Sequence, residues 1–351
     1  MATWEVIADD ITLTPHPNAD TLEIGKVGLF QIVTKKGTYS TGDLVVFAPE
    51  RSILPEEIRD HYKSSTGNSY LVGAQHDRVH GVTLRGEPSD GVLLPLDFVY
   101  RKLGTTDIPR REDLSARLDI TKYEPPIPLG MAGDVENLQD YWQDAQRLGE
   151  HDVERYQIFA EAIPEGEPVI ITEKLHGSQI AILRSSRSDE LKVSSKGLLN
   201  RRLGLKYTLD NIYWFALTNT PGAAAALAEF RPGCSLQAWG EVIPCQHLKY
   251  GQVRPSIYFY RVTCDGADVP REALPPALQD HWVPVLYAGP FKKELLGELA
   301  KKNEQVSGKE LHHSEGIVVR PVVLRNLPDT RSAAFLKVLN PKYHARDDEI
   351  A

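Results

Sequence analysis

The sequence contains few cysteines and no long hydrophobic run, and both absences narrow the classes to which it can belong. No apolar run approaches the ~20 residues that a membrane-spanning helix needs. The first residues, Met-Ala-Thr-Trp-Glu, have neither the basic flank nor the apolar stretch of a secretory signal. The three cysteines, Cys234, Cys245 and Cys264, lack metal-ligand spacing and cannot all pair. We therefore expect a cytoplasmic protein without a membrane segment.

Internal repeats and low-complexity tracts are missing as well, and the remaining composition is that of an ordinary globular protein. The 351 residues are 41% hydrophobic and 25% charged, and this length predicts two domains. The formal net charge is −8 at pH 7. Net charge acts mainly on solubility and long-range steering, so it neither supports nor excludes a nucleic-acid partner, which a local basic groove can still bind.

Residues 1–125 are predicted to form a small β-barrel. Apolar alternation or β-branched runs occupy residues 4–14, 21–30, 42–49, 78–84 and 91–96, with turn residues between them. Five or so strands in about a hundred residues are typical of an OB-fold, a common nucleic-acid-binding barrel. Residues 54–62 are expected to form a short helix or a lid over one end of the barrel.

Residues 126–155 are predicted to be a linker with a bridging helix, and residues 156–351 a second domain. Pro125, Pro126 and Pro128 mark the linker, and residues 134–155 are polar and compatible with a helix. In the second domain, strands alternate with predicted helices at residues 208–216, with Thr208 as the N-cap, and at 223–230 and 292–302. This pattern predicts an α+β domain with two sheets that face a cleft.

One stretch, Pro168-Val-Ile-Ile-Thr-Glu-Lys-Leu-His-Gly-Ser-Gln-Ile180, organises the second domain. Its β-branched run predicts a buried strand that ends at Glu173 and Lys174, and Gly177 is expected to let the backbone approach a bound ligand closely. By itself this pattern also fits an edge strand whose lysine points to water. Four further stretches follow it: Trp239-Gly-Glu-Val242, Ile257-Tyr-Phe-Tyr-Arg-Val262, Ser314-Glu-Gly-Ile-Val-Val-Arg320 and Phe335-Leu-Lys-Val-Leu-Asn-Pro-Lys-Tyr343.

Taken in this order, the five stretches resemble the motifs of ATP-dependent RNA ligases in the covalent nucleotidyltransferase superfamily. The first is similar to the nucleotidyl-acceptor motif, in which the lysine becomes attached to AMP. The resemblance implies an OB-like barrel followed by a nucleotidyltransferase domain, with ATP and a divalent metal, Mg²⁺ or Mn²⁺, as cofactors. It implies RNA as partner, with a 5′-phosphate joined to a 3′-OH at nicks in duplexes. No obligate protein partner is expected.

The resemblance also implies roles for the charged residues of the motifs. Lys174 is the expected nucleophile, although an amine attacks phosphorus only when deprotonated and free lysine has a pKa near ~10.4. Lys337 is the expected second cation, which favours the neutral amine and holds the α-phosphate. Glu315 is the expected metal ligand. Glu241 is expected to hold the ribose hydroxyl, and it is a second candidate for the metal.

Five other residues are expected around the nucleotide. Tyr260 matches the ring that stacks on adenine, with Tyr258 as the alternative if the register differs, although an aromatic residue on a strand more often packs in a core. Glu173 matches the contact to the adenine amino group. Lys196 matches a basic residue that reaches the ribose or phosphates. His176 matches a family hallmark, for which a hydrogen-bonded loop histidine is the plainer explanation.

Two departures from the family pattern and the domain order narrow the subgroup. Leu339 stands where the last motif usually has a second lysine, and Arg261 stands where many relatives have aspartate. The barrel precedes the transferase domain, and only about eight residues follow the last motif, so we expect no C-terminal OB domain. These features place the chain nearest to the Deinococcus-type RNA ligases, which seal 3′-OH/5′-phosphate nicks.

A basic stretch with Arg201, Arg202 and Lys206 is the candidate phosphate track for RNA, and a solvated loop is an equally good explanation for it. Two other functions remain open at this stage. One is an OB-fold RNA-binding protein with a silent transferase domain. The other is a DNA ligase or a capping-type nucleotidyltransferase with its domains in a different order.

Overall fold

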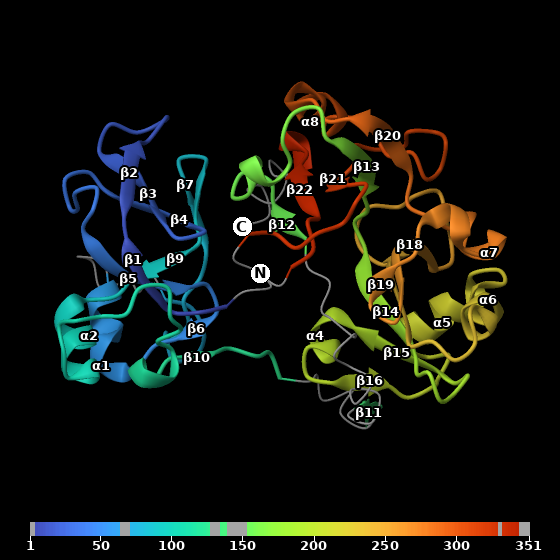
Figure 1. The fold of residues 1–351 in the computed structure, drawn as a ribbon, viewed down its shortest axis with the longest axis horizontal. Coiled ribbons are helices and arrows are strands. Elements are labelled where there is room, and N and C mark those ends of the chain that lie inside the picture. The colour runs from blue at the N-terminus through green and yellow to red at the C-terminus, as the bar shows by residue number, and fades with distance from the viewer. Residues whose placement is uncertain (1–3, 64–70, 127–133, 139–152, 329–331, 344–351) are drawn as a thin grey trace. The chain divides into compact units, whose positions relative to one another are not determined.

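The computed structural model describes residues 4–63, 71–126, 134–138, 153–328 and 332–343. The chain divides into two compact units, one of Thr3–Pro126 and one that holds Ile127–Ala351 (Figure 1). Within the described ranges, no helix combines the length and the apolar character that crossing a membrane would require.

The N-terminal unit is built from short antiparallel strands. They are β1 (Ile7–Asp10), β2 (Thr12–Pro15), β3 (Leu22–Val27), β4 (Phe30–Lys35), β5 (Leu44–Pro49), β6 (Ser52–Ile53), β7 (Val82–Leu84), β8 (Glu87–Ser89), β9 (Gly91–Leu93) and β10 (Thr121–Lys122). They pair in the orders β1-β5-β9, β2-β3-β4, β7-β8 and β10-β6. The helical segments are α1 (Glu56–Arg59), η1 (Asp60–Tyr62), α2 (Leu96–Leu103) and η2 (Ala116–Leu118).

The strands of this unit are mostly apolar on one side because that side faces the hydrophobic core. Val46 and Ala48 of β5 are fully buried and share a cluster with Phe98 and Val99 of α2. The predicted short helix at residues 54–62 is confirmed as α1 and η1. The elements that were not anticipated include strands β4 and β8, and helix α2, which begins where the last predicted strand was expected to end.

The C-terminal unit carries two larger sheets with helices between the strands in sequence. Its strands are β11 (Val135–Asn137), β12 (Glu154–Arg155), β13 (Pro168–Lys174), β14 (Ser178–Arg184), β15 (Leu191–Ser195), β16 (Leu203–Leu205), β17 (Leu236–Ile243), β18 (Ser256–Cys264), β19 (Ala267–Asp268), β20 (Val285–Pro290), β21 (Gly316–Pro321) and β22 (Leu336–Leu339). Its helices are α4 (Lys196–Leu199), α5 (Ile212–Asn219), α6 (Ala223–Glu229), α7 (Pro276–Gln279) and α8 (Lys293–Leu299), with 3-10 turns η4 (Ala160–Ala162) and η5 (Arg271–Ala273).

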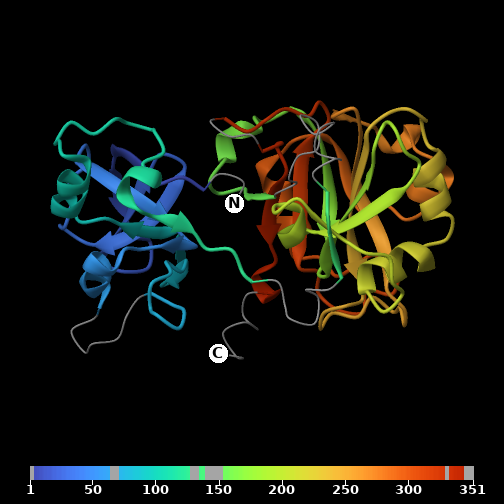
Figure 2. The ribbon, with the colours of Figure 1, turned by 90° about the horizontal axis from the view of Figure 1, so that it is seen from below.

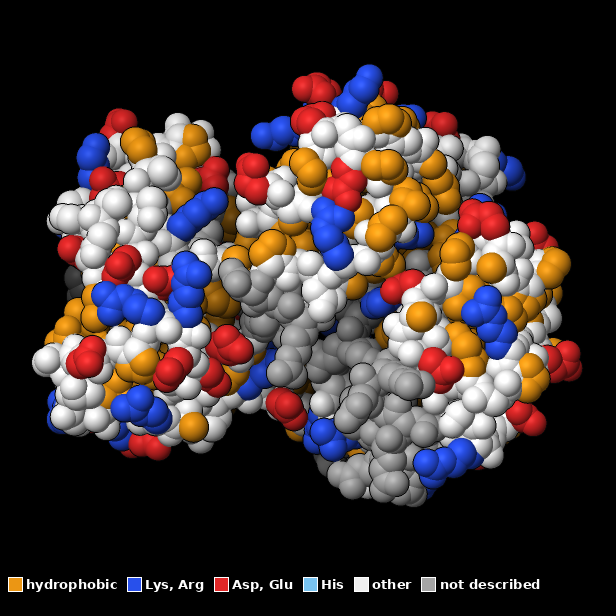
Figure 3. Space-filling model, in the orientation of Figure 1, with side chains coloured by type: hydrophobic (Ala, Val, Ile, Leu, Met, Phe, Trp, Pro, Cys, Tyr) orange, Lys and Arg blue, Asp and Glu red, His pale blue; other side chains and the backbone are white. Residues whose placement is uncertain are grey.

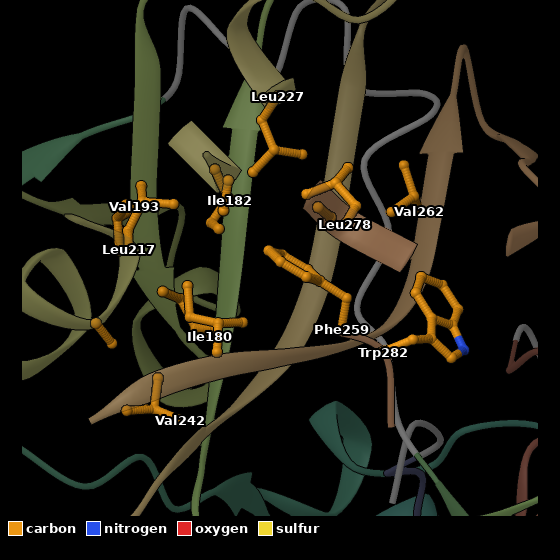
Figure 4. Close-up of a cluster of buried hydrophobic side chains, with 14 of the residues drawn as sticks. Ile180, Ile182, Val193, Leu217, Leu227, Val242, Phe259, Val262, Leu278 and Trp282 are labelled. Atoms are coloured by element: carbon orange, nitrogen blue, oxygen red, sulfur yellow. The ribbon is translucent and has the colours of Figure 1, made fainter. Parts of the chain in front are cut away.

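The larger sheet has the order β11-β16-β15-β14-β17-β18-β19, and it is covered by helices on one face. Alternate residues of a strand point to opposite faces, and Ile180 and Ile182 of β14 point to the face where α5, α6 and α7 pack. Figure 4 shows these side chains gathered with Phe259, Leu217 and Leu278. In Figure 2 the helices, coloured yellow to orange, lie on the side of this sheet away from the red strands β21 and β22.

The smaller sheet has the order β12-β22-β21-β13-β20 and is also two-faced. Ile171, Val319 and Leu336 on its central strands are fully buried, and helix α8 packs against β21. The alternate residues Thr172, Val318 and Lys337 share the opposite face, because the register places them side by side. The predicted buried strand ahead of Lys174 is therefore confirmed, with β13 paired on both edges.

The region predicted as a linker differs from expectation where the structure describes it. Residues 135–137 form β11, which pairs with β16, and residues 154–155 form β12, which pairs in parallel with β22. Both are strands of the C-terminal unit, since main-chain pairing with these sheets overrides their polar sequence. The bridging helix predicted over residues 134–155 falls largely on residues 139–152, which lie outside the described residues.

Helix α5 begins later than predicted. Its N-cap is Asn211, whose side chain accepts a hydrogen bond from the Tyr213 N–H at 2.9 Å, rather than Thr208. Both residue types cap helices well, and the amide oxygen of Asn211 is the one that meets the free N–H of the first turn.

Two of the three cysteines are paired. A disulfide joins Cys234 to Cys264, with their Cα atoms 5.8 Å apart, and Cys245 is free. An odd number of cysteines excludes only a structure in which all three cysteines are paired with one another. Antiparallel β17 and β18 bring Cys264 opposite Leu236, so residues distant in sequence become neighbours. The cysteine count consequently gives no support to a reducing compartment.

A buried arginine ties the loop after α6 to the larger sheet. Arg184, at the end of β14, is 1% exposed. Its guanidinium donates to the carbonyl oxygens of Leu227, Ala228, Phe230, Arg231 and Cys234 at 2.6–3.4 Å. This single side chain therefore supplies hydrogen-bond donors to the carbonyl oxygens of five residues. A buried carbonyl that loses its donor destabilises the folded state by ~1–3 kcal/mol.

The substitution Arg184→Met keeps the long side chain and removes these donors. We expect the free energy of unfolding of the C-terminal unit to fall by about 3 kcal/mol or more, since several buried carbonyls lose their partner together. Urea unfolding followed by the fluorescence of the buried Trp214, Trp239 and Trp282 measures the change. The matched control is Arg187→Met at an exposed position of the adjoining turn, which should stay within about 0.5 kcal/mol. Equal effects of the two changes would contradict this role for Arg184.

Candidate active site

A pocket of about 260 Å³ opens between the two sheets of the C-terminal unit. It is lined by Val153, Thr172, Glu173, Lys174, Leu175, Gln179, Lys196, Glu241, Tyr260, Trp282, Val283, Val318, Arg320, Phe335 and Lys337. The strand register explains why the smaller sheet supplies its cations. Thr172 pairs with Val318 and Val318 with Lys337, so these side chains share one face, and Lys174 joins them two residues along β13.

The larger sheet supplies the opposite wall. Gln179 of β14 pairs with Glu241 of β17, and both line the pocket. The register between β17 and β18 shifts between Trp239 and Gly240, and such a bulge re-aims the neighbouring side chains. Tyr260 of β18 is the tyrosine that lines the pocket.

Two glycines allow neighbouring backbone segments of the site to lie unusually close together. A Cβ on Gly177 would lie 2.3 Å from the Val242 carbonyl oxygen, and one on Gly316, whose φ is 150°, would lie 2.2 Å from the Val338 carbonyl oxygen. The close approach at Gly177 is made to the protein's own backbone rather than to the pocket, because Gly177 is not among the pocket-lining residues, and its predicted contact with a ligand stays a prediction. It presses the loop after Lys174 onto the strand that carries Glu241, so a larger residue would separate the two.

Lys174 and Glu315 form an ion pair at the pocket. The Lys174 Nζ lies 2.5 Å from the Glu315 Oε1, and the two side chains are 23% and 11% exposed. Burial by itself raises the pKa of Glu315, but the contact with His176 and the charge of Lys174 outweigh it, and its pKa lies below the usual range. Glu315 is therefore an ionised carboxylate beside the amine.

Glu241 has the opposite character. Burial raises its pKa to about 7, while the charge of Lys174 opposes the rise and the nearby Glu315 adds to it. The mutual influence of Glu241, Glu315 and Lys174 shows that the three share one site. Two carboxylates that titrate far apart in one site divide the chemistry between them, because one is charged and the other is close to changing its charge at neutral pH.

Glu173 is a buried carboxyl group in which only one of the two oxygens has a hydrogen-bond partner among the described residues. It is 2% exposed, and its Oε2 accepts a hydrogen bond from the Gln305 N–H at 2.8 Å. Its Oε1 has no hydrogen-bond partner among the described residues. Burial raises the pKa of Glu173 to about 8, against the hydrogen bond from Gln305. Since buried polar atoms in proteins are almost always satisfied, an oxygen without a partner on a residue that lines a pocket indicates a hydrogen-bonding group on the ligand.

His176 lies beside the ion pair and is not among the pocket-lining residues. Its Nδ1 is 3.0 Å from the Tyr343 hydroxyl and 3.6 Å from the Glu315 Oε2, and its Nε2 is 3.0 Å from the His247 Nδ1. Its backbone N–H donates to the Tyr250 hydroxyl. The ring therefore lies in a network of polar side chains that borders the ion pair.

The structure brings most of the predicted site residues together. Lys174, Glu173, Lys196, Glu241, Tyr260 and Lys337 line one pocket, and Glu315 and His176 adjoin it through Lys174. Tyr258, the alternative to Tyr260, is not among the pocket-lining residues, and its hydroxyl accepts a hydrogen bond from the Gln252 Nε2 at 2.6 Å.

Several residues of the site were not anticipated. Gln179 and Arg320 line the pocket, and both lie in the quoted stretches. Arg320 lies two residues after Val318 on β21, so strand alternation could have identified it, whereas Gln179 lies on β14, after the loop that follows Lys174, and reaches the pocket through its pairing with Glu241. Burial lowers the pKa of Arg320. His247 and Tyr343 reach His176 only through the tertiary fold. No local pattern in the sequence identifies them as neighbours.

The site offers two carboxylates for a metal. In the described parts of the chain, no group of three or more His, Cys, Asp and Glu side chains is arranged to hold a metal ion. Glu241 and Glu315 fit a hard divalent cation only if phosphate oxygens and water complete its shell, which is the usual arrangement for Mg²⁺ on a nucleotide.

Comparisons with known proteins agree with this geometry. The family model described as RNA ligase matches residues 167–339, and a model of an OB-fold domain matches residues 5–96. The C-terminal domain is an RNA ligase domain. The chain thus joins an N-terminal OB-fold domain to an RNA ligase nucleotidyltransferase domain, and it is an enzyme of the ligase class. A comparison with the curated proteins found no match.

Solved structures of Naegleria gruberi RNA ligase share the fold of the whole chain. The structure with PPi has a TM-score of 0.68 at 21% identity and covers 99% of each chain. A mutant with ATP and Mn has a TM-score of 0.69 at 20% identity, covering 99% of this chain and 100% of that chain. A mutant with AMP and Mn has a TM-score of 0.68 at 21% identity, covering 98% and 99%. At this identity, the likeness establishes the shared fold alone.

The raised pKa of Glu173 predicts a pH-dependent stability of the RNA ligase domain. Between the ordinary value of 4.5 and about 8, the folded protein holds a proton that the unfolded chain has released, so the free energy of unfolding falls as pH rises through this window. Glu173→Gln removes the titration. We expect the variant to gain stability relative to wild type from pH 5 to pH 9, by about 4 kcal/mol in total.

Urea unfolding of both proteins at several pH values measures this difference. Glu229→Gln, at an exposed position at the end of α6, is the matched control and should give a difference that does not change with pH. A difference for Glu173→Gln that is flat across the window, or that declines with pH, would contradict the assignment.

Proposed function

We propose that the protein is an ATP-dependent RNA ligase that works through a lysyl-AMP intermediate. The observation that carries the proposal is the Lys174–Glu315 pair at the entrance to a pocket with Lys337 on one wall and Glu241 and Tyr260 on the other. An amine, a second cation and two carboxylates around a cavity between two sheets are the groups that nucleotidyl transfer to lysine requires.

In the first step, the neutral Lys174 Nζ attacks the α-phosphorus of ATP. A P–N bond forms, the bond between the α-phosphorus and its bridging oxygen breaks, and pyrophosphate leaves with that electron pair. The proton of the ammonium has to leave before the attack, and Glu315, which holds the amine in the structure, is the adjacent carboxylate. Lys337, across the sheet from Thr172, is placed to stabilise the charge that develops on the α-phosphate.

In the second step, an oxygen of the RNA 5′-phosphate attacks the same phosphorus, the P–N bond breaks, and Lys174 takes up a proton as it leaves. In the third step, a 3′-OH attacks the phosphorus of the activated end. The new phosphodiester forms, AMP departs, and the hydroxyl proton is released. All three steps use the same cations, so positioning and charge stabilisation in one pocket serve the whole cycle.

Glu315 and Glu241 are the proposed metal ligands, together with phosphate oxygens and water. A divalent metal, Mg²⁺ or Mn²⁺, would neutralise the phosphate charge and aid the departure of pyrophosphate. Glu315 is suited to this role because it is ionised, and Glu241, with its pKa near 7, is suited to hold a ribose hydroxyl as well.

The pocket favours adenine as the base. The Glu173 Oε1 is buried without a partner in the described residues, and the exocyclic amine of adenine donates the hydrogen bond that it lacks. The O6 carbonyl of guanine would present an acceptor at the same place. Tyr260 lines the pocket and is proposed to stack on the base, while Lys196 at the start of α4 is proposed to reach the ribose or the phosphates.

Duplexes with a nick bearing a 3′-OH and a 5′-phosphate are the proposed substrates. The support is the motif pattern shared with nick-sealing ligases of the Deinococcus type, in which an N-terminal OB-fold domain precedes the transferase domain as it does here. Naegleria gruberi RNA ligase, whose structures carry ATP and Mn or AMP and Mn, has the same domain order over its full length.

Intact-protein mass spectrometry after incubation with ATP and Mn²⁺ tests the first step. We expect an added AMP on the peptide that contains Lys174 in the wild type and none in Lys174→Ala. Lys337→Ala should form the adduct about 10²–10³-fold more slowly, as for the loss of one charge-stabilising donor. Lys293→Ala, at an exposed lysine of α8, is the control and should match the wild type.

Label transferred from GTP or NAD in place of ATP would assign the protein to another class of nucleotidyltransferase. RNA retention without any AMP adduct would show a silent transferase domain and overturn the proposal. A panel of nicked RNA, RNA/DNA and DNA duplexes then separates RNA ligation from DNA ligation.

Removal of divalent metal supplies an independent prediction. With EDTA, adduct formation should fall below detection, and Mg²⁺ or Mn²⁺ should restore it. Glu315→Gln should raise the metal concentration needed for half-maximal rate, since it removes the ionised ligand. An unchanged metal titration in this variant would exclude Glu315 as a ligand.

A further inference from the structure

The segment from the end of α4 to the start of α5 exposes an aromatic ring among basic side chains. Tyr207 is 64% exposed and Leu209 is 51% exposed, and Arg202 and Lys206 are exposed beside them. An exposed aromatic ring leaves apolar surface in contact with water. A ring of this kind with cations beside it suits a ligand that carries both planar groups, which can stack on the ring, and negative charge. Arg201, Arg202, Lys206, Tyr207 and Leu209 are called the Tyr207 surface below.

The fold places this surface beside the pocket. Strand β16, which precedes Lys206, pairs with β15, and β15 leads directly into Lys196, a residue of the pocket wall. From the other end, Tyr213 in the first turn of α5 forms a hydrogen bond of 2.7 Å with the hydroxyl of Ser178, four residues after Lys174. Both ends of the segment are therefore attached to the walls of the proposed active site.

The ring of Tyr207 is held in place from one side. It meets Trp214 edge-on, with ring centroids 5.1 Å apart and an interplanar angle of 75°. Trp214 is buried, and its Nε1 donates to the Leu205 carbonyl at 2.8 Å. A ring oriented in this way loses little conformational freedom when a base stacks on it, which favours binding.

The charge of the surface is locally opposite to that of the protein. Three cations lie along the segment, namely Arg201, Arg202 and Lys206, and Lys196 lies at the start of α4 just before it. The exposed carboxylates nearby are Asp134 and Asp210. The whole chain carries −8, and the face in Figure 3 shows basic and acidic side chains interspersed, without one broad basic field. A short basic segment next to the pocket can accordingly direct a phosphate backbone there.

We propose that the Tyr207 surface binds the RNA strand next to the joining site, with Tyr207 stacking on a base and Arg202 and Lys206 contacting phosphates. The proposal rests on the ligase function proposed above and adds to it where the RNA lies. RNA is favoured over a protein partner because the ring and the cations are contiguous with a pocket that acts on phosphates.

Binding of a nicked RNA duplex with a 5′-phosphate, measured by fluorescence anisotropy at several salt concentrations, tests the proposal. Tyr207→Ala should weaken binding about 5- to 140-fold, the equivalent of ~1–3 kcal/mol for a stacked base. Tyr207→Phe, which keeps the ring, should bind as the wild type does. Arg202→Gln and Lys206→Gln should each reduce the slope of log K against log salt by about one.

Lys293→Gln on α8 is the matched control for charge and should leave both affinity and slope unchanged. Lysyl-AMP formation needs no RNA, so it reports in every variant whether the pocket is intact. Loss of RNA binding together with retained lysyl-AMP formation supports the proposal.

RNA affinity that is unchanged in Tyr207→Ala and in both charge variants would overturn the proposal and leave the surface to another partner, such as a protein. Equal weakening in Tyr207→Phe and Tyr207→Ala would overturn the stacking role. Failure of the wild type to form lysyl-AMP while it binds RNA would refute the ligase function and not the binding surface.

Discussion

The Lys174–Glu315 ion pair is the interaction on which the rest of the site depends. It joins the end of β13 to the residue before β21, two antiparallel neighbours whose register is set along six paired residues. Because the pair is largely shielded from water, the charge of each partner acts strongly on the groups around it. The charge of Lys174, together with the contact to His176, keeps Glu315 ionised against the effect of burial, whereas the high pKa of Glu241 comes mainly from its own burial, with a contribution from Glu315.

The two sheets hold this pair in different ways. The smaller sheet contributes the cations, because alternate positions on three neighbouring strands face one side. The larger sheet contributes Glu241 and Tyr260 from strands that Gly177 and Gly240 allow to lie unusually close to their neighbours. A pocket with positive charge on one wall and an acid and an aromatic ring on the other matches the phosphates, ribose and base of a nucleotide. The same walls continue into the Tyr207 surface, so nucleotide and RNA would meet at Lys174.

Much of the fold could be predicted because the relevant signals are local. The β-branched run before Lys174 and the aromatic alternation around Tyr260 predict strands that the structure contains. The failures occurred where main-chain pairing with distant strands decides the outcome. Residues 135–137 and 154–155 have a polar, linker-like sequence, yet they complete the edges of the two sheets. Helix α2 was missed because apolar spacing in a short segment fits a strand end as well as a first helical turn.

The sequence by itself determined the candidate groups of the site: the lysine at the end of β13, the order of the motifs and the carboxylates at strand ends, since these depend on residue type and short spacing. Only the tertiary structure decided how these groups act. Charge and burial are properties of a neighbourhood, so the unsatisfied oxygen of Glu173, the opposite protonation of Glu241 and Glu315 and the contacts of His176 with His247 and Tyr343 appear only once distant strands are brought together. The pairing of Cys234 with Cys264 was decided in the same way. Which groups interact through charge or hydrogen bonds depends on their distance in the folded structure, and the order of residues along the chain does not give that distance.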